Sequence, residues 1–212
     1  MKVISLVQQK GGSGRSTLAT NIAGILSKAH DVTLIDCDVP QGTTASWYAI
    51  RREDNHPGNL NVLTADSYTS LVNQVHGLTT DYLILDAPPR VEEITRAILM
   101  LSDLLLIPLG ASAAEIWATT DLIDTIQDAE KTHKGLITRI VWNRYRGYTK
   151  SAQELSKAVN TGLPVKSCKT KLGYRVAYAE ALGRGLTVAE WSNMTARQEI
   201  VALTAEIVKL LK

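Results

Sequence analysis

The sequence predicts an α/β protein with a mostly parallel, twisted sheet that is flanked by helices on both faces. Short runs rich in apolar and β-branched residues alternate with longer segments of helical periodicity, a pattern typical of parallel sheets wrapped by helices. Several runs, such as residues 83–85 and 104–107, are apolar on both faces, as expected of buried parallel strands. The chain has 212 residues, of which 45% are hydrophobic, so we expect a single domain over residues 1–212.

In chain order, we expect strands at residues 2–7, 32–35, 61–64, 82–85, 104–108 and 137–142. The helical segments between them are expected at residues 17–29, 43–52, 68–75, 92–101 and 113–133. Residues 55–59, Asn-His-Pro-Gly-Asn, predict a turn rather than a domain linker. Residues 196–211 repeat apolar side chains at helical spacing. Because Glu199 and Glu206 lie on this helix, we expect it to pack on the sheet rather than on a membrane.

The composition narrows the class of protein. The formal net charge is +2, so a polyanion would need a local basic patch rather than a basic tail. Cys37 and Cys168 are the two cysteines, which fits a reducing compartment better than a disulfide framework. The first strand begins at once, which leaves no room for a signal peptide, and no apolar run reaches membrane-spanning length. We therefore expect a cytoplasmic protein.

Residues 8–17, Gln-Gln-Lys-Gly-Gly-Ser-Gly-Arg-Ser-Thr, follow the first strand and precede a helix. A strand, a glycine loop and a helix start in that order form a phosphate cradle, where backbone N–H groups converge on an anion. The usual nucleotide-binding loop ends Gly-Lys-Ser/Thr, with the lysine at the outer phosphates and the hydroxyl on Mg²⁺. Here Arg15 replaces that lysine, Gln9 replaces the first glycine, and Lys10 precedes the glycine pair.

Aspartates end two of the expected strands. Asp36 and Asp38 follow the second strand, and Asp86 follows the fourth. The carboxyl ends of parallel strands are where open sheets bind ligands, and a carboxylate beside a phosphate loop can hold the Mg²⁺ shell. Alone, each aspartate would more often cap a turn or a helix. Together with the loop at residues 11–17, they predict a metal-assisted nucleotide site.

These motifs resemble those of the ParA/MinD family of deviant Walker ATPases. The resemblance rests on residues 10–17 (Lys-Gly-Gly-Ser-Gly-Arg-Ser-Thr), 36–42 (Asp-Cys-Asp-Val-Pro-Gln-Gly) and 83–88 (Leu-Ile-Leu-Asp-Ala-Pro), and it covers essentially the whole chain. Residues 173–185 are also similar to a late Arg-x-x-Tyr-x-x-Ala-x-x-x-Gly stretch of ParA proteins. The resemblance implies a deviant P-loop NTPase fold of the SIMIBI-like kind. It points to a small ParA-type protein without a helix-turn-helix domain, of the plasmid-partition or carboxysome-positioning type.

The resemblance also implies roles for the matching positions. Backbone amides of Gly11, Gly12, Ser13, Gly14, Arg15, Ser16 and Thr17 would cradle the phosphates of ATP, and Asn143 would contact the adenine. Mg²⁺ would be held by Ser16, Asp36 and Asp86. Lys10 matches the lysine that crosses a nucleotide-sandwich homodimer to the partner's phosphates, and Asp38 matches the aspartate that positions the attacking water.

Arg15 is the departure from the family pattern. Arginine is planar and forked, so it does not simply replace a compact ammonium group in a tight loop. We expect hydrolysis to be much reduced while some ATP binding remains. The intact surroundings of Arg15 also suggest an engineered substitution.

ParA proteins bind nucleoid DNA without sequence preference as ATP dimers, and a ParB-like or cargo adaptor protein stimulates hydrolysis. Such binding needs only a basic surface against phosphates. The candidates are Arg144, Arg146 and Lys150 after the sixth strand, and later Lys166, Lys169, Lys171, Arg175 and Arg184. A solvated charged face is the alternative reading of these residues. The cargo, whether plasmid, chromosomal locus or protein organelle, is not encoded in these motifs.

Three other classes share the phosphate loop. A MinD-like membrane-cycling ATPase would need an amphipathic tail, and we expect no stable membrane association. An iron–sulfur reductase would need paired cluster cysteines at the dimer interface, which Cys37 and Cys168 do not match. A nucleotide-binding scaffold without turnover is made more credible by Arg15.

Overall fold

The computed structural model describes residues 1–56, 58–90 and 93–212. Six strands form one sheet in the order β3-β2-β4-β1-β5-β6, and every pairing in it is parallel. The fold class expected from the sequence is therefore confirmed. The strands are β1 (Lys2–Leu6), β2 (Val32–Asp36), β3 (Leu60–Thr64), β4 (Tyr82–Asp86), β5 (Leu104–Leu109) and β6 (Ile137–Trp142).

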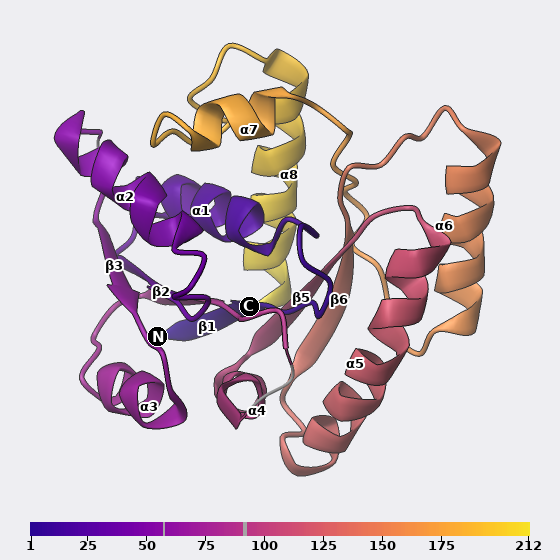
Figure 1. Cartoon of the computed structure of the whole chain (residues 1–212), viewed down its shortest axis with the longest axis horizontal. Helices are drawn as coiled ribbons and strands as arrows, with labels where there is room; N and C mark the ends of the chain where they lie inside the picture. Colours follow the sequence, from indigo (N-terminus) through magenta and orange to yellow (C-terminus); the bar gives the residue numbers. More distant parts are fainter. Residues whose placement is uncertain (57, 91–92) are drawn as a thin grey trace.

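Helices cover both faces of the sheet (Figure 1). One face carries α1 (Arg15–Leu26), α2 (Thr43–Glu53), α7 (Ala177–Leu182) and α8 (Met194–Leu210). The other carries α3 (Tyr68–His76), α4 (Glu93–Leu101), α5 (Ala113–Thr132) and α6 (Lys150–Gly162). The sheet thus separates two hydrophobic layers, which accounts for strands that are apolar on both sides.

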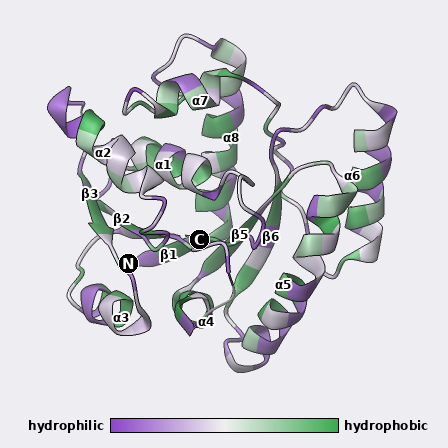
Figure 2. Cartoon of the chain, in the orientation of Figure 1, coloured by the Kyte–Doolittle hydropathy of each residue, from purple (hydrophilic) through white to green (hydrophobic). Residues whose placement is uncertain are grey.

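The alternation of side chains along each strand divides the core between these layers. In β5, Leu105 and Ile107 pack in the layer with α3, α4 and α5, whereas Leu104 and Leu106 pack in the layer with α1 and α8. All four are fully buried. Figure 2 shows β5 and β6 largely hydrophobic, while the outer helices alternate hydrophobic and hydrophilic stripes, as helices with one buried face do.

Two helices were not expected from the sequence. Helix α6 is capped by Thr149, whose side chain accepts a hydrogen bond from the N–H of Ala152. The buried residues of the helix are Ala152, Ser156 and Val159, of which only Val159 is a large apolar residue. The segment is therefore polar on average, and it does not stand out as an apolar helix in the sequence. Helix α7 is six residues long and lies inside the stretch that resembled ParA proteins. The expected helix at residues 92–101 is confirmed from Glu93 onward. Glu92, at the expected start of that helix, and Pro57, in the expected turn at residues 55–59, lie outside the described residues.

The last helix, α8, packs on the sheet as expected. Its Ile200, Leu203 and Ile207 side chains are fully buried in the layer with α1. No helix in residues 1–56, 58–90 or 93–212 combines the length and apolar character needed to cross a membrane.

The topology also fixes where a ligand can bind. Strand β1 lies between β4 and β5, and the chain leaves it toward β2 and β3 before returning toward β5 and β6. Open α/β sheets bind ligands at such a point, outside the carboxyl ends of the strands. The loop after β1 occupies that position.

Candidate nucleotide site

The loop between β1 and α1 has the backbone of an anion cradle. Gly12 and Gly14 adopt positive φ angles of 72° and 97°, which favour glycine. Gly14 is the N-cap of α1, and no side chain caps that end, so the first amides of the helix remain available to an anion. A side chain at Gly14 would collide with Asn143. A hollow lined by residues 11–17 together with Asp38, Gln41, Thr43 and Pro89 opens beside the loop.

The Arg15 side chain is folded into the base of this loop. It is 6% exposed, and its Nε donates to the carbonyl oxygen of Ala87 at 2.9 Å. One terminal nitrogen donates to the carbonyl oxygens of Gln8 and Lys10, the latter at 3.2 Å. The other terminal nitrogen lies 3.5 Å from Oδ2 of Asp38. Burial lowers the pKa of Arg15, and the carboxylates of Asp86 and Asp38 oppose that shift. The guanidinium thus joins the phosphate loop to the loops after β2 and β4.

The aspartates after β2 and β4 differ in what holds them. Both oxygens of Asp36 accept backbone N–H groups, from Asp38 at 3.0 Å and from Ala45 at 3.3 Å. Asp36 therefore supports the loop that carries Asp38. In Asp86, Oδ2 accepts the hydroxyl of Thr44 at 2.9 Å, whereas the buried Oδ1 has no hydrogen-bond partner among the residues that the structure describes.

The two carboxylates, Asp36 and Asp86, lie side by side, because Asp36 pairs with Asp86 in the register of β2 and β4. Burial raises the pKa of Asp86 to about 7, and the nearby hydroxyl groups of Ser16 and Thr44 oppose that rise. Burial also raises the pKa of Asp36. A buried carboxylate oxygen without a partner, next to the Ser16 side chain, fits the donor set that Mg²⁺ prefers. These residues fit a Mg²⁺–phosphate group better than they fit a purely structural cap.

The remaining predicted positions fall into two groups. Lys10 is exposed at the rim of the loop, and Ser16 and Thr17 are half-buried in the lining of the hollow. Ser13 is buried, and its Oγ has no hydrogen-bond partner in the described part of the chain. Asn143 does not stand free: its Nδ2 donates to the carbonyl oxygen of Ser13 at 2.8 Å, and its Oδ1 accepts the N–H of Arg144. Asn143 therefore supports the phosphate loop from β6.

Two supporting residues were not singled out from the sequence. Gln8 is fully buried, and its amide donates to the carbonyl oxygen of Pro108 at 3.2 Å and to the Thr119 hydroxyl at 2.9 Å. It therefore fixes the start of the loop to β5 and α5. Thr44, at the first turn of α2, holds Asp86. These partners lie 100 or more residues from Gln8 and 42 residues from Thr44, so local patterns carried no signal for either role.

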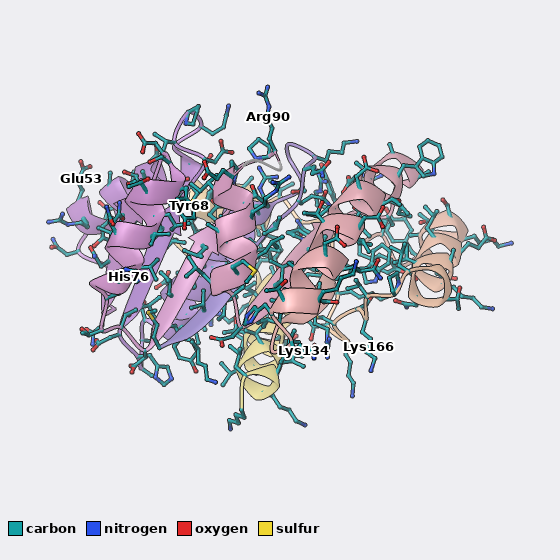
Figure 3. All side chains as sticks on the ribbon, turned by 90° about the horizontal axis from the view of Figure 1, so that it is seen from below. Glu53, Tyr68, His76, Arg90, Lys134 and Lys166 are labelled. Atoms are coloured by element: carbon teal, nitrogen blue, oxygen red, sulfur yellow. The ribbon has the colours of Figure 1, made fainter. Side chains whose placement is uncertain are left out.

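The structure separates the predicted DNA-contacting residues. Arg146, Lys171 and Arg175 line one hollow after β6, with Arg175 bound to Glu199 at 2.6 Å. Arg144 lies beside them and is bound to Glu115 at 2.9 Å. Lys169 is exposed farther back along β6, and Lys166 lies beside Ile140 of that strand, on the side away from Arg90 (Figure 3). Of the predicted cations, three therefore line one hollow with Arg144 beside it, and the candidates do not form a single patch.

Comparison with known proteins gives a consistent result. The family model described as the CobQ/CobB/MinD/ParA nucleotide binding domain matches residues 4–188. The chain is 28% identical to maintenance of carboxysome distribution protein A of Halothiobacillus neapolitanus, over 97% of this chain and 95% of that protein. It is 26% identical to the chromosome-partitioning ATPase Soj of Thermus thermophilus, over 88% of this chain and 87% of that protein.

Solved structures show the same fold. McdA of Cyanothece without nucleotide superposes with a TM-score of 0.80 at 19% identity, covering 98% of this chain and 99% of that one. A McdA variant of Cyanothece in complex with ATP gives a TM-score of 0.77 at 19% identity, covering 98% and 96%.

Proposed function

Because this chain belongs to the CobQ/CobB/MinD/ParA nucleotide-binding family, we propose that it is a ParA-type ATPase that positions or segregates a cargo. In this proposal, ATP and Mg²⁺ bind at residues 11–17, and two chains close around the nucleotide. The dimer then binds nucleoid DNA without sequence preference, and an adaptor on the cargo stimulates hydrolysis. The relatives named for carboxysome distribution and chromosome partitioning support this reading.

One observation carries the proposal. Lys10 is exposed at the rim of the glycine loop, and residues 11–17 of that loop line a hollow together with Asp38. A cation at the rim is free to reach a phosphate bound to a second chain, whereas a lysine tied into the loop would not be. The arrangement therefore suits a nucleotide shared between two copies.

The residues of this chain would divide the work of hydrolysis. The amides of the loop and the N-terminus of α1 would bind and orient the phosphates. Bound Mg²⁺ would neutralise developing charge on the phosphoryl oxygens. Ser16 and Asp86 would hold it, with Asp36 fixing the loop beside them. Asp38 would orient the attacking water once its carboxylate is released from Arg15.

The ion pair between Arg15 and Asp38 opposes the release of the Asp38 carboxylate. Its guanidinium contacts Asp38 and three carbonyl oxygens in the base of the loop. A planar group held in this way does not follow the transferring phosphoryl group as a flexible ammonium does. We therefore propose that ATP binds but is hydrolysed slowly. A nucleotide-binding scaffold without turnover is the second candidate, and the same ion pair favours it.

A membrane-cycling role has less support. The apolar side of α8 is buried against the sheet. Its acidic Glu206 accepts the N–H groups of Lys169 and Thr170 at 2.7 and 3.0 Å, so this helix is held to the segment beside β6. We propose a cytoplasmic protein that associates with the nucleoid in its ATP state.

DNA retention with ATP tests the proposal. A mobility-shift assay with duplex DNA at low salt should show retention with ATP and Mg²⁺ and little without. Reversing the charge at both Lys169 and Lys171 to Glu should abolish it, because the protein–phosphate attraction is electrostatic. Lys2→Glu, at the exposed first residue of β1, is the control and should bind as the unmodified chain does. Absence of ATP-dependent retention in the unmodified chain would refute the DNA-binding part of the proposal.

A further inference from the structure

Three tyrosines and three cations surround a hollow at the carboxyl end of β6. The hollow is lined by Tyr145, Arg146, Gly147, Tyr148, Lys171, Gly173, Tyr174, Arg175 and Glu199. These residues come from two segments that the fold places side by side. The chain after α6 returns along the outer edge of β6 (Figure 1), with Ser167 paired to Ile140 and Gly173 to Tyr145. The hollow is therefore built by the sheet edge rather than by one loop.

The cations of the hollow differ in how far they are neutralised. Arg175 donates to both oxygens of Glu199, at 3.0 and 2.6 Å, and Glu199 also accepts the N–H of Gly173. Within the described parts of the chain, Arg146 and Lys171 have no acidic partner within 4.0 Å. Two positive charges therefore remain available to an anion.

Both available cations lie against aromatic faces. The guanidinium of Arg146 is 4.7 Å from the ring centre of Tyr174, and the ammonium of Lys171 is 4.1 Å from that of Tyr145. Tyr145 is fixed in place, because its ring packs on Trp142 and its hydroxyl lies 3.3 Å from that of Ser156. Gly147 leaves the space beside the Tyr145 ring free, because a Cβ at position 147 would lie 3.0 Å from that ring.

The rim of the hollow presents unused ring surface. Tyr148 is 84% exposed and Tyr174 is 58% exposed, which are high values for large aromatic side chains. Aromatic faces next to cations favour ligands that have a flat π system and, beside it, a negatively charged group. A nucleobase with its backbone phosphate has all three properties, and stacking of bases on tyrosine is a main source of affinity for single strands.

We propose that this hollow binds single-stranded DNA, with unpaired bases stacked on Tyr148 and Tyr174 and the phosphates at Arg146 and Lys171. The inference rests on the proposed DNA binding and deepens it. Bases in a duplex are stacked on each other, so a duplex would reach only the cations at the rim. A single strand would use rings and cations together.

Fluorescence polarisation with labelled oligonucleotides of equal length tests this inference. The probes are a thymidine oligomer, an abasic oligomer that keeps the phosphates, and a duplex. We expect the thymidine oligomer to bind at least about fivefold more tightly than the abasic oligomer. Replacing Tyr148 and Tyr174 together with Ala should remove that difference, and replacing both with Phe should preserve it. Tyr68→Ala, at a tyrosine that is 44% exposed on α3 (Figure 3), is the matched control.

The outcomes separate this inference from the proposed function. Equal binding of thymidine and abasic oligomers would overturn base recognition, while duplex retention would leave the proposed function standing. If the variant with Ala at both Tyr148 and Tyr174 binds the thymidine oligomer as tightly as the unmodified chain does, the bases bind elsewhere and the inference is overturned. With ATP and Mg²⁺ present in every titration, absence of binding of the unmodified chain to all three probes would refute both.

Discussion

The Arg15 side chain contacts several of the loops that form the candidate nucleotide site. Its guanidinium is bound to the carbonyl oxygen of Ala87 and paired with Asp38, so it connects loops that follow three different strands. Arginine stays charged at any pH at which the protein folds, and its fork is rigid. A residue of this kind can hold an empty site together, and it can also keep Asp38 from a water molecule.

The interpretation of Asn143 changes at the same scale. The family resemblance implies a contact of Asn143 with the adenine ring. The bond from Asn143 to the carbonyl oxygen of Ser13 instead indicates support of the phosphate loop. Gly14 leaves the space that this amide occupies.

Replacing Asn143 with Ala should therefore weaken nucleotide binding. Loss of one buried hydrogen bond corresponds to about 1 kcal/mol, or about fivefold in the dissociation constant. Titration with a fluorescent ATP analogue measures the effect. Asn160→Ala removes an exposed asparagine on α6 that bonds only Ser167, and it serves as the control. Unchanged affinity in the Asn143 variant would show that the loop does not depend on this bond.

At the scale of elements, an ion pair ties α2 to the segment before α8. Arg51 is 3% exposed and donates to both oxygens of Glu190 at 3.0 Å. Glu190 also accepts the N–H and hydroxyl of Thr187. Burial alone would raise the pKa of Glu190, but these hydrogen bonds outweigh it and lower the pKa to about 2, from an ordinary value of 4.5.

This shift fixes the sign of a pH dependence. Because the folded chain holds the Glu190 proton less tightly than the unfolded chain, the stabilisation is complete above pH 4.5 and is lost as the pH falls toward 2. Glu190→Gln should lower stability at pH 7 on the order of 3 kcal/mol, because it removes the carboxylate charge with which Arg51 pairs. The Tm should fall by roughly 6–12 °C. Thermal unfolding between pH 7 and pH 2.5 should show a flatter acid limb in the variant.

Glu53→Gln provides the control for that measurement. Glu53 ends the same helix and lies at the surface (Figure 3), so its loss should change the Tm little. An equal fall in Tm for both variants, or an unchanged acid limb in Glu190→Gln, would contradict the assignment.

At the scale of the whole molecule, the sequence predicted the sheet well because its strands are buried on both faces. All six strands were expected within two residues of their observed bounds, and the aspartates at their ends marked the ligand-binding edge. Helix α6 escaped prediction because its buried residues, Ala152, Ser156 and Val159, include one large apolar side chain, so the segment is polar on average although its spacing is helical. The same limit applies to α7, which is a little more than one turn long.

In the candidate site, too, the local features could be predicted from the sequence and the long-range contacts could not. Residues 11–17 form a local motif and could be identified from spacing alone. The contact of Arg15 with Ala87 spans 72 positions, and that of Asn143 with Ser13 spans 130. Only the packed sheet brings these groups together. The tyrosine and cation hollow likewise required the pairing of two distant segments along β6.

The most direct test of the central claim is ATP turnover by the unmodified chain and by Arg15→Lys at saturating ATP and Mg²⁺. We expect turnover to rise on the order of 10²-fold in the lysine variant, because a cation that follows the transferring phosphoryl group is restored and Asp38 is released. Nucleotide affinity should change much less. Equal turnover in the two proteins would contradict the account.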